Sequence, residues 1–501
     1  MLRVELETRA SALFPTGSIS RKNLSMAVTD DASPREDGWL ARTALKFTAW
    51  AERWFPDAFV FVGLAVAIVA LAALLNGAPP LVVAKSFGDG FWSLVLFTMQ
   101  LAVMMIGGYV LAVAPPVERG IERLASIPRT GRGAVVFIGA VAMLVSMLNW
   151  AMSLIFGALL ARACARRTDI HMDYRAAGAA AYLGVGATWA FGIGSAAAQF
   201  QANPTGLPAS ILNVTGIIPL TQTIFLWQSL LTGALFFIMS IAIAWWSVPS
   251  RGSTLRAQDM GVDVSLDARD LDPPSRPGEW LEYSPILTVA LVALGGMWLV
   301  QEFATRGLIG GISNLNTYNF IFIMMGLLLH WRPRSFLAAV QKSVPSVGGV
   351  LVQFPFYGGI AAILTNATNA AGVSVTDQMA HAFASLATQS TYTIVMGFYS
   401  IILGLFIPAG GARWILAASH VMQAANDLKV HLGWAVQAFN AVSMSNLINP
   451  FFMLPLLGVL RLKPRDIVGY TFLQFLWHVP IGLFLFWLFA HTLTYMPPVM
   501  P

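Results

Sequence analysis

The sequence predicts an all-α membrane protein that crosses the bilayer many times. Of its 501 residues, 57% are apolar and only 11% are charged, whereas soluble domains usually carry about 25% charged residues. Apolar stretches of the roughly 20 residues needed to cross a hydrocarbon core recur along nearly the whole chain. The stretch 176–250 contains no Asp, Glu, Lys or Arg. These stretches are apolar on every side of a helix, so lipid is their expected solvent.

The charge and the cysteine content exclude several classes of protein. The net charge of +6 comes largely from Arg and Lys in short loops beside apolar segments, as in cytoplasmic loops, so no nucleic-acid partner is expected. Cys164 is the single cysteine, which excludes an internal disulfide. No group of Cys and His has metal-ligand spacing. We therefore expect no metal and no cofactor.

The N-terminal residues 1–41 are polar, carry charges of both signs and lack the apolar core of a signal peptide. They are predicted to form a disordered cytoplasmic tail. Met26 is an alternative start, and the sequence leaves that choice open.

Eleven apolar segments follow the tail and are the predicted membrane elements. They are 57–76, 90–114, 134–161, 176–200, 223–246, 285–303, 318–330, 343–364, 393–418, 434–458 and 467–492. Arg42, Lys46 and Arg53 place the N-terminus in the cytoplasm, because cytoplasmic loops are enriched in basic residues. Four later loops are equally basic and are expected on the same side: 119–132, 162–175, 332–342 and 461–465.

This charge distribution predicts two re-entrant hairpins. Segment 134–161 lies between two basic loops, and a single crossing cannot return to the same side. We therefore predict that it turns back near Asn149 and Trp150 and opens inward. The same argument makes 393–418 a hairpin that opens outward and breaks at Pro408-Ala-Gly-Gly411. The predicted total is nine transmembrane helices and two hairpins.

The elements form two groups of five with opposite orientation. The first repeat covers 42–246 and the second 305–501, separated by a cytoplasmic linker at 247–284 and a connecting span at 285–304. Inverted repeats with broken elements are typical of secondary transporters, which hold their substrate where the broken backbones meet. Irregular backbone at membrane depth is tolerated only where protein or water satisfies it, so a cavity is expected there.

Polar residues at the breaks are the predicted binding residues. Free amides and a helix N-terminus at a break make an anion site, although Gly and Asn also serve simple helix packing. Each hairpin is followed by a span with its own polar interruption, and Gln353-Phe-Pro-Phe-Tyr-Gly-Gly359 is a further interruption. The predicted substrate-binding residues are Asn149, Trp150, Ser153, Thr188, Ser195, Gln353, Gly410, Gly411, Arg413, Asn446 and Asn449.

Arg413 is the one ionisable residue of the second hairpin. An intramembrane charge is costly, so a functional role is the default hypothesis, and a guanidinium can hold a carboxylate through two hydrogen bonds. The alternative is a structural anchor that reaches outward to the membrane surface.

Coupling to an ion is expected to use neutral oxygens. Away from the segment ends, no Asp or Glu lies within a predicted span. Sodium held by carbonyls, Asn and Ser, or a proton carried on the substrate acid, therefore fits better than a buried carboxylate. The candidate cation-binding residues are Ser146, Asn149, Ser445 and Asn446.

Several motifs, in order, resemble the bacterial short-chain fatty acid transporter family from about residue 42 to the C-terminus. They are Phe87-Gly-Asp-Gly-Phe-Trp92, Asn149-Trp150, Leu351-Val-Gln-Phe-Pro-Phe-Tyr357 and the Pro-x-Gly-Gly-x-x-Trp of Pro408 to Trp414. The resemblance implies uptake of short carboxylates such as butyrate or acetoacetate by an ion-coupled carrier in the cytoplasmic membrane. A homodimer is also open.

The chain departs from the family pattern at the second hairpin. Ala409, Ala412 and Arg413 stand where the pattern has Ser, Gly and His, Leu416-Ala-Ala418 replaces Gln-Gly-Pro, and Ala190-Phe191 stands where glycines are expected. A fixed positive charge favours a larger or more anionic acid as the alternative substrate. A membrane enzyme is not expected, because no nucleophile and base or metal-ligand motif is present. A passive carboxylate channel is the second alternative.

Overall fold

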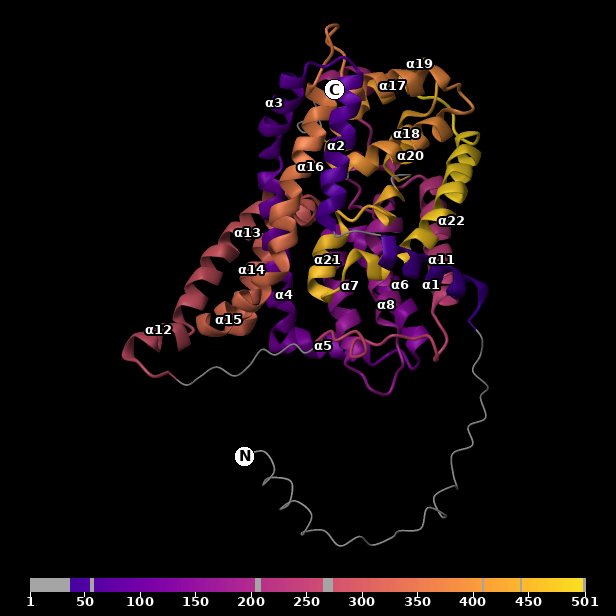
Figure 1. The fold of residues 1–501 in the computed structure, drawn as a ribbon. Coiled ribbons are helices and arrows are strands. Elements are labelled where there is room, and N and C mark those ends of the chain that lie inside the picture. Colours follow the sequence, from indigo (N-terminus) through magenta and orange to yellow (C-terminus); the bar gives the residue numbers. More distant parts are fainter. Residues whose placement is uncertain are drawn as a thin grey trace, which may run out of the picture. The chain divides into compact units, whose positions relative to one another are not determined.

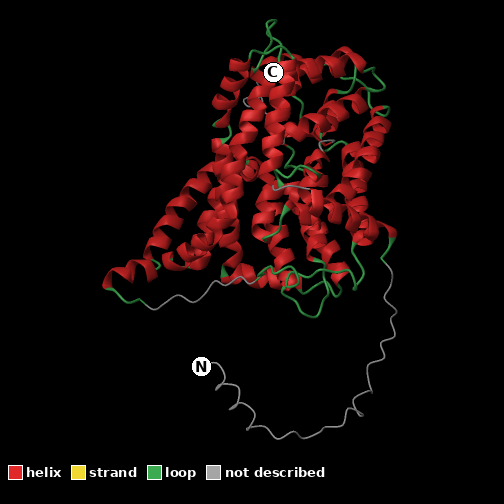
Figure 2. Cartoon of the chain, in the orientation of Figure 1, coloured by secondary structure: helices red, strands yellow, loops and turns green. Residues whose placement is uncertain are grey.

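The described part of the chain is built from helices alone, as the hydropathy predicted. The computed structural model describes residues 37–498 apart from 55–57, 203–208, 265–273, 408–409 and 442–443, and Figures 1 and 2 show helices and loops without a strand in that part. Of the predicted tail at 1–41, residues 1–36 lie outside the described residues. Residues 39–41 instead begin a helix. Leu40 and Ala41 lie on the buried face of this amphipathic helix.

In its described residues, the first half of the chain forms eleven α-helices and, between α8 and α9, two further helical turns. The α-helices are α1 (Trp39–Trp54), α2 (Ala58–Leu75), α3 (Pro80–Phe91), α4 (Val95–Val113), α5 (Pro115–Ala125), α6 (Gly131–Leu148), α7 (Trp150–Ala165), α8 (Tyr174–Leu183), α9 (Ala196–Ala202), α10 (Ala209–Thr215) and α11 (Trp227–Ser247). The turns are a π-helix, η1 (Gly184–Thr188), and a 3₁₀ helix, η2 (Trp189–Phe191). Together η1 and η2 interrupt the predicted span 176–200.

The second half repeats this alternation of long and broken helices. Its α-helices are α12 (Trp280–Tyr283), α13 (Ile286–Ser313), α14 (Leu315–His330), α15 (Pro333–Ser343), α16 (Gly348–Asn366), α17 (Val375–Leu386), α18 (Tyr392–Phe406), α19 (Gly410–Asp427), α20 (Leu432–Ala441), α21 (Met453–Leu460) and α22 (Pro464–Ala490). The remaining short turns are η3 (Leu220–Gln222), η4 (Pro277–Glu279), η5 (Val344–Val347) and η6 (Met444–Leu447). Here η6 interrupts the predicted span 434–458.

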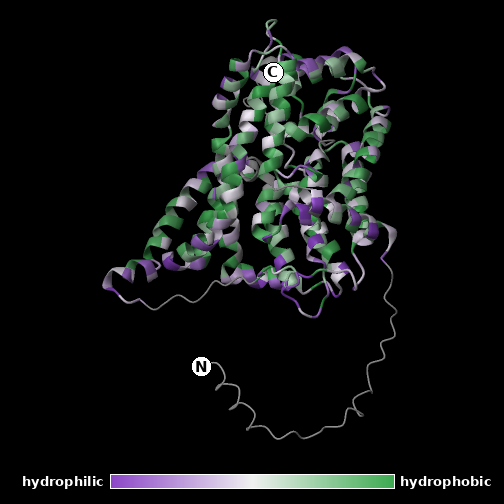
Figure 3. Cartoon of the chain, in the orientation of Figure 1, coloured by the Kyte–Doolittle hydropathy of each residue, from purple (hydrophilic) through white to green (hydrophobic). Residues whose placement is uncertain are grey.

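Each of the eleven predicted apolar segments contains helix. In the described residues, six helices are long and apolar enough to cross a membrane, or seven if the bent pair Thr98–Leu111 and Pro115–Ala125 is one span. The predicted span 434–458 is not among them, because its helices α20 and α21 are only 10 and 8 residues long. Most of the helices consist mainly of hydrophobic residues, and hydrophilic residues lie largely in loops and at helix ends (Figure 3). The protein is a multi-pass membrane protein.

The chain turns back at the first predicted break. Asn149 separates α6 from α7 in an extended conformation, with φ −153° and ψ 120°. Its side-chain oxygen accepts a hydrogen bond from the amide of Met152 at 3.1 Å, and thereby caps α7. Ser153 on α7 then donates to the carbonyl of Ala142 on α6 at 2.8 Å. The two helices therefore pack antiparallel, as a helical hairpin requires.

The second predicted break also lies between antiparallel helices. Tyr392 near the start of α18 donates to the carbonyl of Val421 near the end of α19 at 2.7 Å. At the opposite end of this pair, a β-carbon built on Gly404 would collide with Arg413. Pro408 and Ala409, which the sequence placed at the break, lie outside the described residues.

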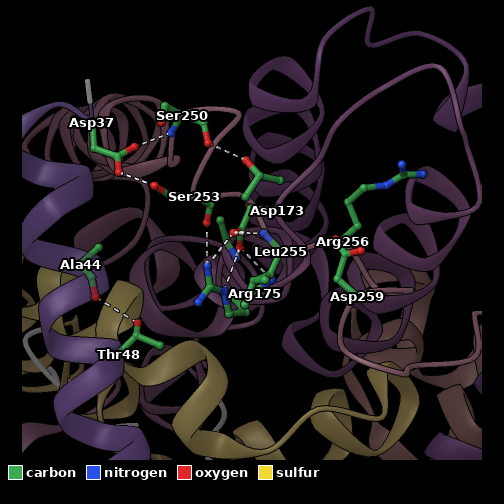
Figure 4. Close-up of polar contacts among 12 residues, drawn as sticks. Asp37, Ala44, Thr48, Asp173, Arg175, Ser250, Ser253, Leu255, Arg256 and Asp259 are labelled. Atoms are coloured by element: carbon green, nitrogen blue, oxygen red, sulfur yellow. Dashed lines mark hydrogen bonds and ion pairs between the residues drawn. The ribbon is translucent and has the colours of Figure 1, made fainter. Parts of the chain in front are cut away.

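The first part of the predicted linker 247–284 is docked on the protein (Figure 4). Asp173 is buried and makes three kinds of contact: it caps α8, forms an ion pair with Arg175 at 2.8 Å, and accepts from the amide of Leu255 at 3.1 Å. Asp37 accepts from the hydroxyl of Ser253 at 2.7 Å. Because both carboxylates hold the segment 250–255, that segment is a strap across the start of α8 and not a free linker.

Candidate functional site

Two interrupted helices cross in the interior of the protein, one from each half of the chain. The first is formed by α8, η1 and η2, and the second by α20, η6 and α21. Tyr182 donates to the carbonyl of Asn446 at 2.8 Å, and the amide nitrogen of Asn446 lies 3.5 Å from the carbonyl of Val185. We call this region the crossing. It brings together residues about 260 positions apart in the sequence.

The close approach depends on glycine and on amide side chains. A β-carbon on Gly186 would collide with the side chain of Leu447, so the two backbones could not approach as they do. Further along the same helices, Gln437 donates to the carbonyl of Ala190 at 2.7 Å, and Asn440 donates to the hydroxyl of Ser195 at 2.9 Å. These side chains satisfy backbone and hydroxyl groups that the unwound segment leaves without helical partners.

Each hairpin tip touches the interrupted helix of the other half. The ring of Trp150, at the start of α7, packs edge-on against Phe452, with 5.2 Å between ring centroids. Reciprocally, Gly410 at the start of α19 lies against Trp189 in η2, and a β-carbon there would come within 2.7 Å of the indole ring. Four elements, two from each half, therefore meet at the crossing.

The first-half side of the crossing is closed by its own hydrogen bonds. The hydroxyls of Ser146 and Thr188 lie 2.9 Å apart, and Ser146 also donates to the carbonyl of Met143 at 2.8 Å. Gly194 donates its amide to the carbonyl of Met147 at 3.2 Å. These groups tie the unwound segment to the first hairpin, so their polar atoms are engaged within the protein.

The second-half side contains Arg413, whose side chain is completely buried. Both of its terminal nitrogens, Nη1 and Nη2, have no hydrogen-bond partner among the described residues. Ser445 Oγ and Asn446 Oδ1 are also buried and have no hydrogen-bond partner within the described part of the chain. A β-carbon on Gly404 would collide with both Arg413 Nη1 and Ser445 Oγ, so these two atoms converge on one point.

This cluster has the chemistry of an anion site. A buried charge without a partner costs several kcal/mol, because desolvation is not compensated. A carboxylate bound by Nη1 and Nη2 would supply the missing charge and hydrogen bonds, and the hydroxyl of Ser445 can donate to the same ligand. The alternative role of Arg413 as an outward-reaching anchor is wrong, because the side chain is fully buried.

The structure divides the predicted site residues into four groups. Thr188, Ser195, Gly410, Arg413 and Asn446 lie at the crossing through the contacts given above. Asn149, Trp150 and Ser153 shape the first hairpin. Asn449 ties the second interrupted helix to α18, because its amide donates to the carbonyls of Gly404 and Leu405 at 3.2 and 2.9 Å.

Gln353 and Gly411 form the fourth group, on α16 and α19. Gln353 is buried, and its neighbour Phe354 stacks on Phe451 with ring centroids 3.9 Å apart. Gly411 belongs to the first turn of α19. The predicted cation residues are split, with Ser146 and Asn149 on the first hairpin and Ser445 and Asn446 beside Arg413.

Sequence analysis missed three side chains that build the crossing: Tyr182, Gln437 and Asn440. Gln437 and Asn440 are three residues apart in a predicted span, and hence on one helix face, so their spacing was an available signal. Tyr182 offered no such signal, because a lone tyrosine in an apolar helix usually indicates packing.

Comparison with known proteins identifies the family of the chain. A family model described as short chain fatty acid transporter matches residues 39–489. An Escherichia coli K12 protein provisionally named a short-chain fatty acid transporter is 32% identical over 457 residues, which are 89% of this chain and 100% of that protein. A Haemophilus influenzae protein with the same provisional name is 28% identical over 450 residues, with coverage of 88% and 98%.

Solved structures give a weaker likeness. Neisseria gonorrhoeae MtrF, described as one of a class of antimetabolite efflux pumps, matches with a TM-score of 0.40 at 14% identity over 91% of this chain and 100% of that one. The YdaH transporter of Alcanivorax borkumensis matches with a TM-score of 0.38 at 14% identity, over 90% and 97%. At these scores the likeness carries no argument about the site.

Proposed function

This chain belongs to the short-chain fatty acid transporter family, and we propose that it carries short-chain carboxylates such as butyrate and acetoacetate across the membrane as a secondary active transporter. It is a transporter and not an enzyme. The observation that carries the proposal is the fully buried guanidinium of Arg413, whose Nη1 and Nη2 have no partner among the described residues. A small carboxylate is the ligand that satisfies both nitrogens at once.

The crossing supports an alternating-access mechanism. Each hairpin tip rests on the other half, through Trp150 against Phe452 and Gly410 against Trp189. Separation of one such contact would open the site toward one side, and separation of the other would open it toward the opposite side. The two hairpins as re-entrant elements, and the two halves as inverted repeats, belong to this proposal.

The coupling ion in the proposal is Na⁺ or H⁺. Ser445 and Asn446 were candidate cation ligands, but Ser445 Oγ lies beside Arg413 Nη1, where a second cation is repelled. Ser146 and Asn149 on the first hairpin lie apart from that charge, but their side-chain oxygens already take part in hydrogen bonds within the protein. A proton can instead enter on the substrate, because a short carboxylic acid accepts one directly.

The expected location is the bacterial cytoplasmic membrane with the N-terminus inside. The basic loops that indicate this orientation border α5, α7, α14 and α21. A homodimer is compatible with the proposal and is not needed to complete the site, since Arg413 and its neighbours come from one chain.

A larger or more anionic organic acid is the alternative substrate. Arg413 favours it, because a fixed charge replaces the histidine of the family pattern. A passive carboxylate channel is the alternative mechanism, and it would not accumulate substrate against a gradient.

Uptake into proteoliposomes tests the proposal. Radiolabelled butyrate and acetoacetate are offered with a sodium gradient or a proton gradient imposed separately, and Arg413→Gln protein serves as the control. Concentrative uptake that depends on one gradient and is lost in Arg413→Gln supports the carrier and identifies its ion. Uptake that only equilibrates indicates a channel. No uptake of either acid, with uptake of a dicarboxylate, indicates the alternative substrate.

A further inference from the structure

A polar cavity lies away from the crossing, where α18 and α20 begin and α22 ends. Its volume is about 250 Å³, and its polar lining comes from Gln389, Ser390, Lys429, His431 and His491. In Figure 1 these helix ends lie toward α17 and α19, opposite α5. We call this cavity the Lys429 pocket.

The pocket is lined by cationic and donor groups. None of its lining residues is an Asp or Glu. The ammonium of Lys429 lies 4.7 Å from the ring centroid of Tyr495 and has no ion-pair partner among the described residues. The nearest acid in sequence, Asp427, accepts from the side-chain amide of Gln423 at 2.8 Å. A small anion would therefore meet Lys429 without competition from a lining carboxylate.

The hydrogen bonds of His431 make it a donor toward a ligand. Its Nδ1 accepts from the amide of Trp434 at 3.1 Å. The neutral imidazole must then hold its proton on Nε2, which leaves an N–H available as donor. This residue also stands directly before α20, whose dipole favours an anion at the same place.

The remaining lining is apolar and suits a short hydrocarbon chain. Val430, Trp434, Ala490 and Leu493 complete the wall of the pocket. Ligand sites for drug-sized molecules usually have volumes of about 300 to 1,000 Å³, so this smaller space fits a molecule of a few carbon atoms. Donors on one side and aliphatic groups on another match an amphiphilic monocarboxylate better than an inorganic anion.

The backbone at Lys429 adds an independent observation. Lys429 has φ 56°, in the left-handed region, and the amide of the next residue, Val430, bonds the carbonyl of Ala425 at 2.9 Å. This is the C-terminal helix motif whose left-handed position is usually glycine. A lysine in the last turn would serve the helix dipole equally well in ordinary helical geometry. Lys429 thus holds a position that glycine would fill without conformational strain.

Two helices connect the pocket with the crossing. Helix α20 lines the pocket with Trp434 and reaches the crossing with Gln437 and Asn440. Helix α19 carries Arg413 near its start, and Lys429 follows two residues after its end. At 1.5 Å per residue, the separation of Arg413 and Lys429 in the sequence corresponds to about 24 Å along the helix axis.

From these observations we propose that the Lys429 pocket binds short-chain monocarboxylates, as an access site that precedes the Arg413 site. The assignment of the substrate class rests on the proposed function. The carboxylate lies against Lys429 and His431 Nε2, and the alkyl chain lies against Val430 and Leu493. The test uses the full chain, and the probe is butyrate, with its uncharged methyl ester as the control ligand.

The key variant is Lys429→Gly, because glycine suits the left-handed conformation and the fold should be kept or gain thermal stability. Butyrate binding is measured by calorimetry in an Arg413→Gln background, where the crossing is disabled. We expect binding that the ester does not reproduce, and at least tenfold weaker binding after Lys429→Gly is added. Lys463→Gln, which removes a lysine before α22, should leave binding unchanged.

Transport gives the second readout. Lys429→Gly alone should raise the KM for butyrate uptake several-fold with kcat kept, whereas Arg413→Gln should abolish uptake. Binding in the Arg413→Gln background that is indifferent to Lys429→Gly overturns the pocket and leaves the transporter proposal intact. Lys429-dependent binding in a protein that never transports butyrate supports the pocket as a carboxylate site and overturns the transporter proposal instead.

Discussion

The two sides of the crossing differ in how their polar groups are satisfied. On the first-half side, the hydroxyls of Ser146 and Thr188 pair with each other at 2.9 Å and also contact the carbonyl of Met143. On the second-half side, Arg413 Nη1 and Nη2 and Ser445 Oγ are equally buried but have no partner among the described residues. The same kind of helix interruption therefore has two outcomes. In the first half its side chains are hydrogen-bonded to one another, and we call this group the closed joint. In the second half its donors have no partner among the described residues.

This difference teaches where a ligand is needed. A satisfied network stabilises the protein as it stands, whereas an unsatisfied one is costly until something binds. Substitutions on the two sides should consequently separate into those that change stability and those that change transport. Four predictions follow from that separation, in order of decreasing effect.

Replacement of Arg413 should have the largest effect. Arg413→Gln removes the charge that would hold a carboxylate, and truncation of a buried charged partner costs about 2 to 5 kcal/mol, so initial uptake should fall about 100-fold or more. Arg413→Lys keeps the charge without the two-nitrogen fork and should give an intermediate rate. Thermal unfolding of the empty protein checks the fold. A lower Tm in Arg413→Gln would indicate a structural partner and contradict the ligand role.

A steric plug at Gly404 should come next. Gly404→Ala places a methyl group where Arg413 Nη1 and Ser445 Oγ converge, while alanine in a helix interior is favourable by about 1 kcal/mol over glycine. We expect the KM for butyrate to rise about tenfold. The matched control is Gly296→Ala in α13, where a β-carbon meets nothing within 4 Å. Equal kinetics in the two variants would show that the Gly404 space is not part of the site.

The third prediction compares the two sides directly. Ser445→Ala removes one neutral donor to the ligand, worth about 1 kcal/mol, so KM should rise about fivefold with little change in Tm. Ser146→Ala removes a hydrogen bond of the closed joint and should cost about 1 kcal/mol of stability with little change in KM. Uptake kinetics and thermal unfolding are measured on both proteins. Interchanged phenotypes would reverse the assignment of the two sides.

The smallest effect should arise at the strap, residues 250–255. Its polar groups, like those of the closed joint, are hydrogen-bonded within the protein. Burial raises the pKa of Asp37, but the hydrogen bonds from Ser250 and Ser253 outweigh it and hold that pKa below its ordinary value of 3.8. A lowered pKa in the folded state stabilises the fold above pH 3.8, and this contribution is lost as the pH falls through the folded value.

Asp37→Asn should therefore lower Tm at pH 7, by less than about 2 °C because the group is largely hydrated. The difference from the wild type should vanish under acid conditions. Thermal unfolding in detergent between pH 7 and pH 3 measures the Tm of Asp37→Asn and of the wild type. A constant difference across that range would show that the charge of Asp37 contributes nothing.

Much of the architecture was predictable because membrane insertion is a local property of the chain. All eleven predicted segments contain helix, and the chain turns at Asn149 between α6 and α7. The family resemblance was confirmed by the match over residues 39–489. The docking of residues 250–255 was not predicted, because it depends on Asp173 and Asp37, which are far from this segment in the sequence.

The candidate site was predicted in part. Arg413 was identified because a charge in an apolar segment is conspicuous by itself, and the glycines at the breaks were visible for the same reason. Gln353 was grouped with the site, but it lies on α16 among residues that pack on Phe451 and not in the hydrogen-bonded crossing. Tyr182, Gln437 and Asn440 were missed, because each of them acts on a backbone or hydroxyl group from the other half of the chain.

The sequence by itself determined that this is a multi-pass helical membrane protein with interruptions at specific residues, because hydropathy and helix breaking are set by neighbours along the chain. Only the tertiary structure decided which interruptions satisfy one another and which remain open. Burial without a partner, as at Arg413, depends on every element that surrounds the group. The convergence of Lys429 and His431 on one pocket likewise required the ends of three helices to meet.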